Sequence, residues 1–212
     1  MNAQTERFTI PGPAGLLEVA RDLAAALDGQ VRGTAVIGHP HPLFAGTMDN
    51  KVVQTLARAF VACGWNAVRF NFRGVGASEG AYDAGKGELA DFMAVVEQLA
   101  PQEPLALAGF SFGSFVMSHA LAGLWPTRPP EKVVFVGTAV SRFTVAPVPP
   151  EAHERTIVIH GEADDTVPLA DVMDWARPQI LPVTVVPGGA HFFHGQSPLL
   201  KGLVMRHLSA TA

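Results

Sequence analysis

The sequence contains a single cysteine and few charged residues. Cys63 is the only cysteine among 212 residues, and Asp, Glu, Lys and Arg together make up 16%. One cysteine excludes an internal disulfide. Apolar residues make up 48%, so we expect a packed globular chain and not a disordered one. The length suffices for one substantial core and is short for two, which predicts a single domain over residues 1–212.

A basic cluster and an apolar leader are also missing. The net charge is −4 and no run of Lys and Arg occurs, which argues against a nucleic-acid partner. Residues 1–8 lack the apolar core of a signal peptide, so we expect a cytoplasmic location. The uncharged run 105–125 has the length of a membrane span. Its glycines, serines and histidine divide it into a strand, a turn and a buried helix, and we expect no membrane partner.

Strand-like and helix-like patterns alternate along most of the chain. This alternation predicts an α/β fold, with a mostly parallel central sheet and helices on both faces. Residues 136–156 are too few for a lid domain, and we expect an irregular loop there. The expected strands are 7–10, 16–20, 34–38, 66–70, 105–108, 132–136, 156–160 and 183–187, and the expected helices are 50–62, 87–100, 115–124, 169–176 and one that begins with Ser197 as N-cap.

The segment GFSFG at 109–113 lies where a strand pattern becomes a helical one. This setting is typical of a nucleophile elbow, a sharp strand-to-helix turn that lifts one serine above the sheet. Side chains at Gly109 or Gly113 would block the close approach of strand and helix. Ser111 is therefore the candidate nucleophile, and the backbone N–H of Phe112 is a candidate oxyanion donor.

Candidate acids and bases follow two later strands. Asp164 and Asp165 come after the strand pattern 156–160, and spacing alone does not separate them. His191 and His194 follow the strand pattern 183–187, and His191 follows it more closely. A serine needs an adjacent base to act as a nucleophile, and an acid to orient that base.

The segment HPHP at 39–42 follows the predicted strand 34–38 and suits the loop that supplies a second oxyanion donor. Proline has no N–H, so Pro40 and Pro42 are excluded. His41 is the first choice and Leu43 the second. A metal site at the two histidines is disfavoured because no carboxylate or cysteine stands at ligand spacing.

With these residues in place, the chain resembles the small lidless bacterial α/β-hydrolases, in the neighbourhood of dienelactone hydrolases and related serine esterases. The order Ser…Asp…His is the order of that fold. The resemblance implies that Asp164 is the acid and His191 the base. It rests on HPHPLFAGTMDNK (39–51), NFRGVGASEG (71–80), GFSFG (109–113), HGEADDTVP (160–168) and GAHFF (189–193).

These residues predict a serine hydrolase that cleaves small carboxylic esters through Ser111, His191 and Asp164, with Phe112 and His41 as oxyanion donors. We expect no cofactor and no metal, and a small-molecule ester as the substrate; no oligomeric state follows from the sequence. Dienelactone hydrolases proper have a cysteine nucleophile, so their substrate does not carry over. The alternatives are a thioesterase or small-amide hydrolase and, in another class, a non-catalytic binding protein on the same fold.

Overall fold

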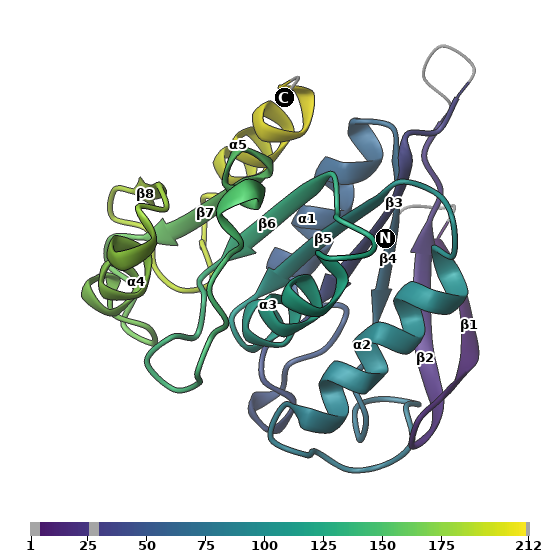
Figure 1. Cartoon of the computed structure of the whole chain (residues 1–212). Coiled ribbons are helices and arrows are strands. Elements are labelled where there is room, and N and C mark those ends of the chain that lie inside the picture. The colour runs from purple at the N-terminus through teal and green to yellow at the C-terminus, as the bar shows by residue number, and fades with distance from the viewer. Residues whose placement is uncertain (1–4, 26–29, 211–212) are drawn as a thin grey trace.

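A computed structural model describes residues 5–25 and 30–210. Its described strands form one eight-stranded sheet in the order β1-β2-β4-β3-β5-β6-β7-β8 (Figure 1). β1 pairs antiparallel with β2, and β2 antiparallel with β4, while the remaining pairs are parallel. The strands are β1 (Thr5–Gly12), β2 (Gly15–Asp22), β3 (Gly33–Gly38), β4 (Trp65–Phe70), β5 (Leu105–Phe110), β6 (Lys132–Val136), β7 (Thr156–Gly161) and β8 (Val183–Val186).

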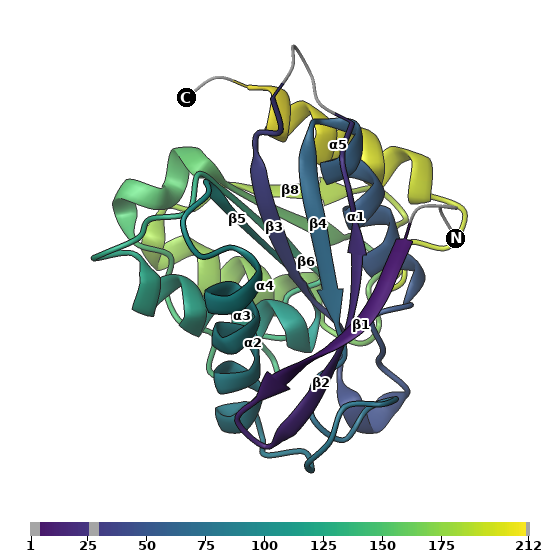
Figure 2. The same ribbon diagram turned by 90° about the vertical axis from the view of Figure 1, so that its right-hand side faces the viewer.

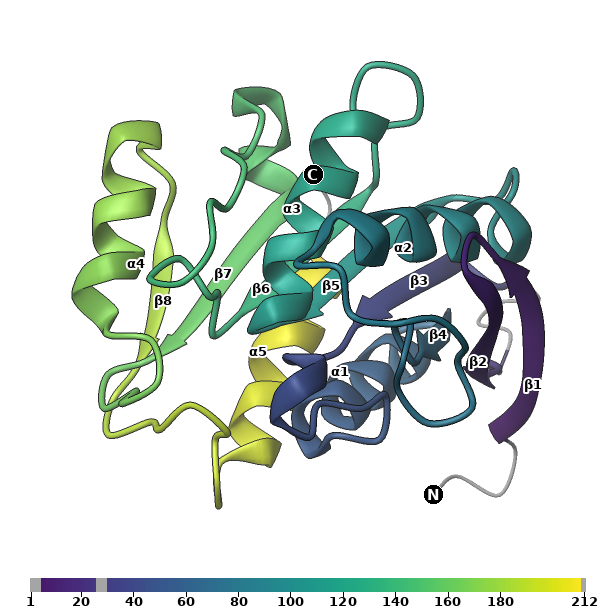
Figure 3. The same ribbon diagram turned by 90° about the horizontal axis from the view of Figure 1, so that it is seen from below.

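Helices cover both faces of the sheet. Figure 3 shows α2 and α3 on one side and α1 and α5 on the other. Each side has its own core: Phe92 and Met117 lie in the first, and Leu56 and Val204 in the second. The helices are α1 (Lys51–Ala62), α2 (Lys86–Leu99), α3 (Phe112–Leu124), α4 (Leu169–Ala176) and α5 (Ser197–Ser209). The predicted α/β architecture is confirmed.

The N-terminal strands form a hairpin at one edge of the sheet (Figure 2). The hairpin is tied to β4 by a buried ion pair, in which Arg69 Nη2 lies 3.0 Å from Asp22 Oδ2. The strands are longer than the apolar pattern predicted, because backbone pairing continues to Thr5 and Asp22 beyond the apolar residues. The candidate site lies away from this hairpin, in the parallel part of the sheet.

Local sequence explains where α1 begins and ends. Asn50 Oδ1 accepts a hydrogen bond from the Val52 N–H at 2.9 Å, which satisfies one free donor of the first turn. Leu56 and Phe60 lie on the buried face. Gly64 follows the helix with φ 83°, a conformation that disfavours other residues. This helix was predicted within one residue.

Three local expectations were inaccurate. Ser197 is the first residue of α5, and Gln196 occupies the N-cap position without a side-chain cap. α3 begins at Phe112, three residues before the expected position 115, because the turn at Ser111 leads directly into the helix. The segment 136–156 is not wholly irregular, since Pro150–Arg155 forms a 3-10 helix.

The parallel strands β3, β5, β6, β7 and β8 end at the same edge of the sheet. The loops that follow them carry the predicted functional residues, as is usual for parallel α/β sheets. No helix in the described ranges is long and apolar enough to cross a membrane.

Candidate active site

Ser111 lies at the turn between β5 and α3. Its backbone has φ 54° and ψ −117°, a conformation that a residue with a side chain rarely adopts. The flanking glycines allow this turn: a Cβ on Gly109 would lie 2.6 Å from the backbone of Gly113, and a Cβ on Gly113 would lie 2.7 Å from the His39 carbonyl oxygen. The strained turn predicted from the glycine spacing is therefore present.

Three of the predicted residues lie in one hydrogen-bonded chain. His191 Nε2 is 3.0 Å from Ser111 Oγ, and His191 Nδ1 is 2.7 Å from Asp164 Oδ2. All three residues are buried, with 7%, 3% and 6% exposure for Ser111, His191 and Asp164. The arrangement pairs a hydroxyl with a base, and the base with a carboxylate.

The Asp164 carboxylate is held from both sides. While Oδ2 faces His191, Oδ1 accepts the N–H groups of Thr166 at 2.9 Å and Val167 at 2.8 Å. Burial opposes ionisation, but the hydrogen bonds from His191 and Val167 and the nearby imidazoles outweigh it and lower the pKa of Asp164. The carboxylate is thus ionised and fixed in position at neutral pH.

The competing residues lie elsewhere. Asp165 is exposed, and its Oδ1 accepts a hydrogen bond from the hydroxyl of its neighbour Thr166 at 3.3 Å. His194 is exposed and contacts the ring of Phe192. The structure therefore brings Asp164 and His191 to Ser111, and neither Asp165 nor His194.

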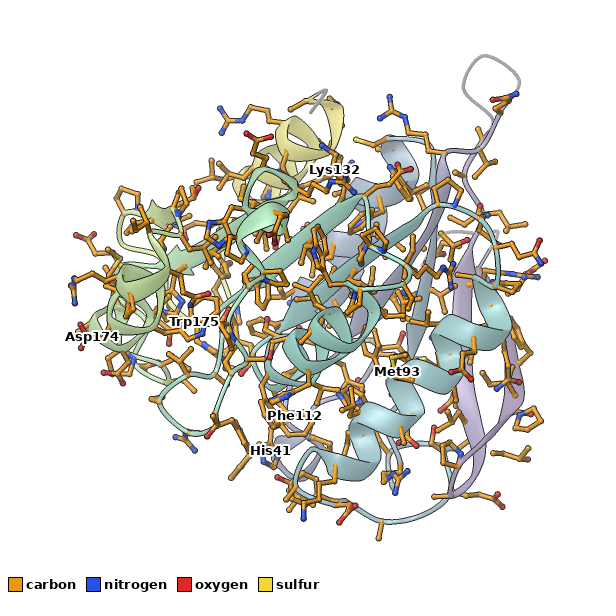
Figure 4. The ribbon with its side chains drawn as sticks, viewed as in Figure 1. His41, Met93, Phe112, Lys132, Asp174 and Trp175 are labelled. Atoms are coloured by element: carbon orange, nitrogen blue, oxygen red, sulfur yellow. The ribbon has the colours of Figure 1, made fainter. Side chains whose placement is uncertain are left out.

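His41 lies beside Phe112 at the carboxyl edge of the sheet, with ring centroids 5.0 Å apart (Figure 4). Its ring is held at both nitrogens: Nδ1 accepts the Leu43 N–H at 3.2 Å, and Nε2 is 3.2 Å from the Tyr82 hydroxyl. Burial and the charge of Arg142 lower the pKa of His41. The ring is therefore neutral, with the proton on Nε2 donated to Tyr82.

A second histidine fixes the start of the same loop. His39 is fully buried; its Nδ1 donates to the Pro40 carbonyl at 2.6 Å and its Nε2 accepts the Phe72 N–H at 3.0 Å. Burial lowers its pKa to about 4. Further along, the Met48 N–H donates to Asn71 Oδ1 at 2.8 Å. Residues 71 and 72 thus hold both ends of the 39–48 loop through hydrogen bonds.

A pocket of about 480 Å³ opens next to Ser111. This volume falls within the usual range for small-molecule sites. Four phenylalanines line it, namely Phe44, Phe112, Phe143 and Phe192. The full lining is Pro40, His41, Phe44, Ala45, Asn50, Ser111, Phe112, Ala139, Arg142, Phe143, Thr166, Val167, His191 and Phe192.

Sequence reasoning missed two groups close to these residues. His160 Nε2 donates to the Val167 carbonyl at 2.9 Å and lies 3.5 Å from Asp164 Oδ2. The pair His160-Gly161, just before Asp164, is the sequence signal that could have identified it. Arg142 lines the pocket from a loop that has no strand or helix period, so no pattern could have pointed to it.

The chain is similar to a protein family and to several known proteins. Residues 42–152 match the family model described as alpha/beta hydrolase fold. The chain is similar to an α/β serine hydrolase without lid from Xanthomonas campestris, with 34% identity, a TM-score of 0.85 and coverage of 100% of this chain and 99% of that one. An α/β serine hydrolase homologue from Coxiella burnetii is 37% identical, with a TM-score of 0.83 and coverage of 96% and 97%.

An uncharacterized protein of Rickettsia prowazekii is 32% identical over 177 residues, which cover 77% of this chain and 68% of that protein. Fold and site together define a lidless α/β-hydrolase. The chain belongs to the α/β-hydrolase family, as the resemblance in the sequence predicted. The fold and its serine hydrolase relatives support hydrolase activity.

Proposed function

We propose that this protein hydrolyses small carboxylic esters through a Ser111–His191–Asp164 triad and an acyl-enzyme intermediate. The observation that carries the proposal is the hydrogen-bonded chain Ser111 Oγ···Nε2 His191 Nδ1···Oδ2 Asp164. The order of its residues along the chain and its position on the elbow support the same conclusion.

In the first half of the reaction, Ser111 Oγ attacks the ester carbonyl carbon while its proton passes to His191 Nε2. Asp164 accepts the Nδ1–H and stabilises the imidazolium. The C–O bond to the alcohol then breaks, and the Nε2 proton goes to the leaving oxygen. In the second half, water gives a proton to His191 Nε2 and attacks the acyl carbon. The bond from that carbon to Ser111 Oγ then breaks, the Nε2 proton returns to Oγ, and the acid leaves.

Two backbone N–H groups are proposed to bind the oxyanion, those of Phe112 and His41. Phe112 is the first residue of α3, where the N–H has no partner within the helix. Among the described residues no hydrogen bond engages the N–H of Phe112 or His41, whereas the Leu43 N–H donates to His41 Nδ1. This difference favours His41 over Leu43 as the second donor.

Carboxylic esters are favoured because the pocket has the volume of a small-molecule site and most of its lining is apolar. An alcohol leaving group needs only the proton that His191 already holds. Thioesters and small amides would follow the same acyl transfer, so a substrate panel must include them.

A fluorophosphonate probe and a panel of p-nitrophenyl esters, thioesters and anilides test the proposal. We expect phosphonylation of the intact protein at Ser111, located by peptide mass spectrometry, and turnover of short esters. Ser111→Ala should lose both while retaining its fold, whereas Ser141→Ala, at an exposed serine near the pocket, should retain both. A protein that neither labels nor turns over any ester would instead be a binding protein on this fold.

A further inference from the structure

Arg142 introduces an unmatched positive charge at the catalytic pocket. Of the described residues that line the pocket, it alone carries a permanent charge, and none of them is Asp, Glu or Lys. No carboxylate in the described part of the chain lies within ion-pair distance of its guanidinium, although Arg7, Arg69 and Arg73 each have such a partner. Arg58 and Arg206 also have no ion-pair partner among the described residues, so what distinguishes Arg142, itself an exposed residue, is its place in the lining of this pocket.

The backbone that carries Arg142 is fixed. The Ala139 carbonyl accepts the N–H of Arg142 at 3.2 Å and of Phe143 at 3.1 Å, which closes a turn. The Phe143 ring stacks on Phe115 of α3, with centroids 4.7 Å apart and planes at 15°. Phe115 follows the nucleophile on the same helix, so the elbow and this turn are packed directly together.

Two hydrogen bonds to α3 hold the rest of the loop. His119 Nε2 donates to the Thr144 carbonyl at 2.9 Å, and Ser118 Oγ accepts the Ala146 N–H at 2.9 Å. The Arg142 side chain therefore starts from a defined place beside the reaction centre, which reduces the entropy lost when its guanidinium binds a ligand.

Two carboxylates close to the pocket residues are already compensated. Asp164 is paired with His191. Glu88 accepts the N–H groups of Asp83 and Gly85, each at 2.8 Å. Asp165, beside the lining residue Thr166, has no cation partner among the described residues, but it is exposed and screened by solvent. A negatively charged substrate would therefore meet the Arg142 guanidinium in a pocket whose described lining contains no Asp or Glu. Arginine is suited to this role because its planar fork binds a carboxylate through two parallel hydrogen bonds.

We propose that Arg142 binds a carboxylate of the substrate, so that the preferred substrates are small esters carrying a negative charge close to the scissile bond. The inference rests on the proposed ester hydrolysis and adds the substrate class. Arg142 acts on the substrate and has no part in the proton transfers of the triad.

The test compares anionic and neutral esters of matched size. In the acyl arm, mono-p-nitrophenyl glutarate is compared with p-nitrophenyl pentanoate, which has an acyl chain of the same length. In the alcohol arm, the pentanoyl ester of m-hydroxybenzoate is compared with that of methyl m-hydroxybenzoate. The ratio of kcat/KM for each pair is measured in the wild type, in Arg142→Gln and in Arg206→Gln, which removes an exposed arginine from the last turn of α5.

We expect the anionic ester of at least one pair to be preferred, and Arg142→Gln to lower that preference about tenfold, mainly through KM. Arg142→Lys should restore part of the preference, and Arg206→Gln should keep all of it. Equal ratios in the wild type and Arg142→Gln would overturn the inference while ester hydrolysis stands. An equal loss of kcat/KM for the neutral and anionic esters in Arg142→Gln would also overturn it. Arg142 would then stabilise the oxyanion or the loop, and would not bind a substrate carboxylate. If no ester is cleaved, the proposed function fails and this inference fails with it.

Discussion

Asp164 Oδ2 lies 2.7 Å from His191 Nδ1, whereas Asp165, the next residue, is exposed. Two N–H groups hold the other oxygen of Asp164, so its carboxylate has little freedom to turn away. Adjacent residues with the same side chain thus occupy different environments, and they provide a matched pair of variants.

We predict that Asp164→Asn folds normally and loses up to about ten-thousandfold in kcat, because the amide favours the wrong imidazole tautomer. Asp165→Asn should keep activity within about tenfold, since among the described residues its carboxylate is hydrogen-bonded only to the neighbouring Thr166 hydroxyl. Steady-state kinetics with a short p-nitrophenyl ester and circular dichroism of both variants check the prediction. The reverse ranking would place the acid at Asp165.

The close approach of α3 to β3 predicts a second matched pair. A Cβ on Gly113 would collide with the Gly38 carbonyl, whereas a Cβ on Gly123 of the same helix has nothing within 4 Å. Gly113→Ala should therefore lower the free energy of unfolding by about 1–3 kcal/mol. Gly123→Ala should raise it by about 0.5–1 kcal/mol, through the helix propensity of alanine.

Urea denaturation of both variants measures the two changes. If Gly113→Ala unfolds at the wild-type urea concentration, the steric reason for the second glycine of the elbow is wrong. A large loss in Gly123→Ala would instead mean that α3 tolerates no change at all, and the comparison would say nothing specific about Gly113.

The tight turn at Ser111 could be predicted from the sequence because its constraints are local. Gly109, Ser111 and Gly113 lie within one turn, and each is required by a steric or chemical constraint of that turn. The alternation of strands and helices predicted the sheet for a similar reason, since apolar periods report which face of each element is buried.

Other features depend on contacts that no local pattern encodes. Spacing could not separate Asp164 from Asp165, because the choice depends on how the turn after β7 meets the loop after β8. Arg142 was missed because its loop is ordered by α3, through Phe115, and has no period of its own. The conformation of such loops is determined by tertiary packing.

His39 predicts how stability depends on pH. Burial lowers its pKa to about 4, while an unfolded histidine titrates near about 6.5. As pH falls below about 6.5, the unfolded chain takes up a proton that the native protein does not, so stability falls by about 1.4 kcal/mol per pH unit until about pH 4. Above about pH 6.5 both states are neutral and this contribution is constant. His207, whose pKa burial also lowers to about 4, adds to the same window.

We predict that the stability of His39→Gln falls less steeply than that of the wild type between about pH 6.5 and about pH 5. The difference between the two slopes should be about 1.4 kcal/mol per pH unit. The variant should also be less stable at neutral pH, because the glutamine amide does not place its donor and acceptor where the two imidazole nitrogens meet the Pro40 carbonyl and the Phe72 N–H. His207→Gln should reduce the slope independently. Urea denaturation at several pH values measures these slopes, and a wild-type slope in His39→Gln would contradict a neutral, buried His39.

The size of the pocket predicts the acyl preference. Its volume is about 480 Å³, its walls include Phe44, which is 71% exposed, and the described residues 5–25 and 30–210 form no lid domain over it. A long acyl chain would therefore leave most of its apolar surface in water and gain little binding energy from its extra methylenes. We predict that kcat/KM for p-nitrophenyl esters is highest for acyl chains of about two to six carbons and falls for longer ones.

Rates are to be measured below the critical micelle concentration of each ester, so that aggregation does not imitate a preference. A maximum at about twelve carbons, or a jump in rate when a lipid interface forms, would require the exposed loops around Phe44 to close over the chain, and would contradict an open site.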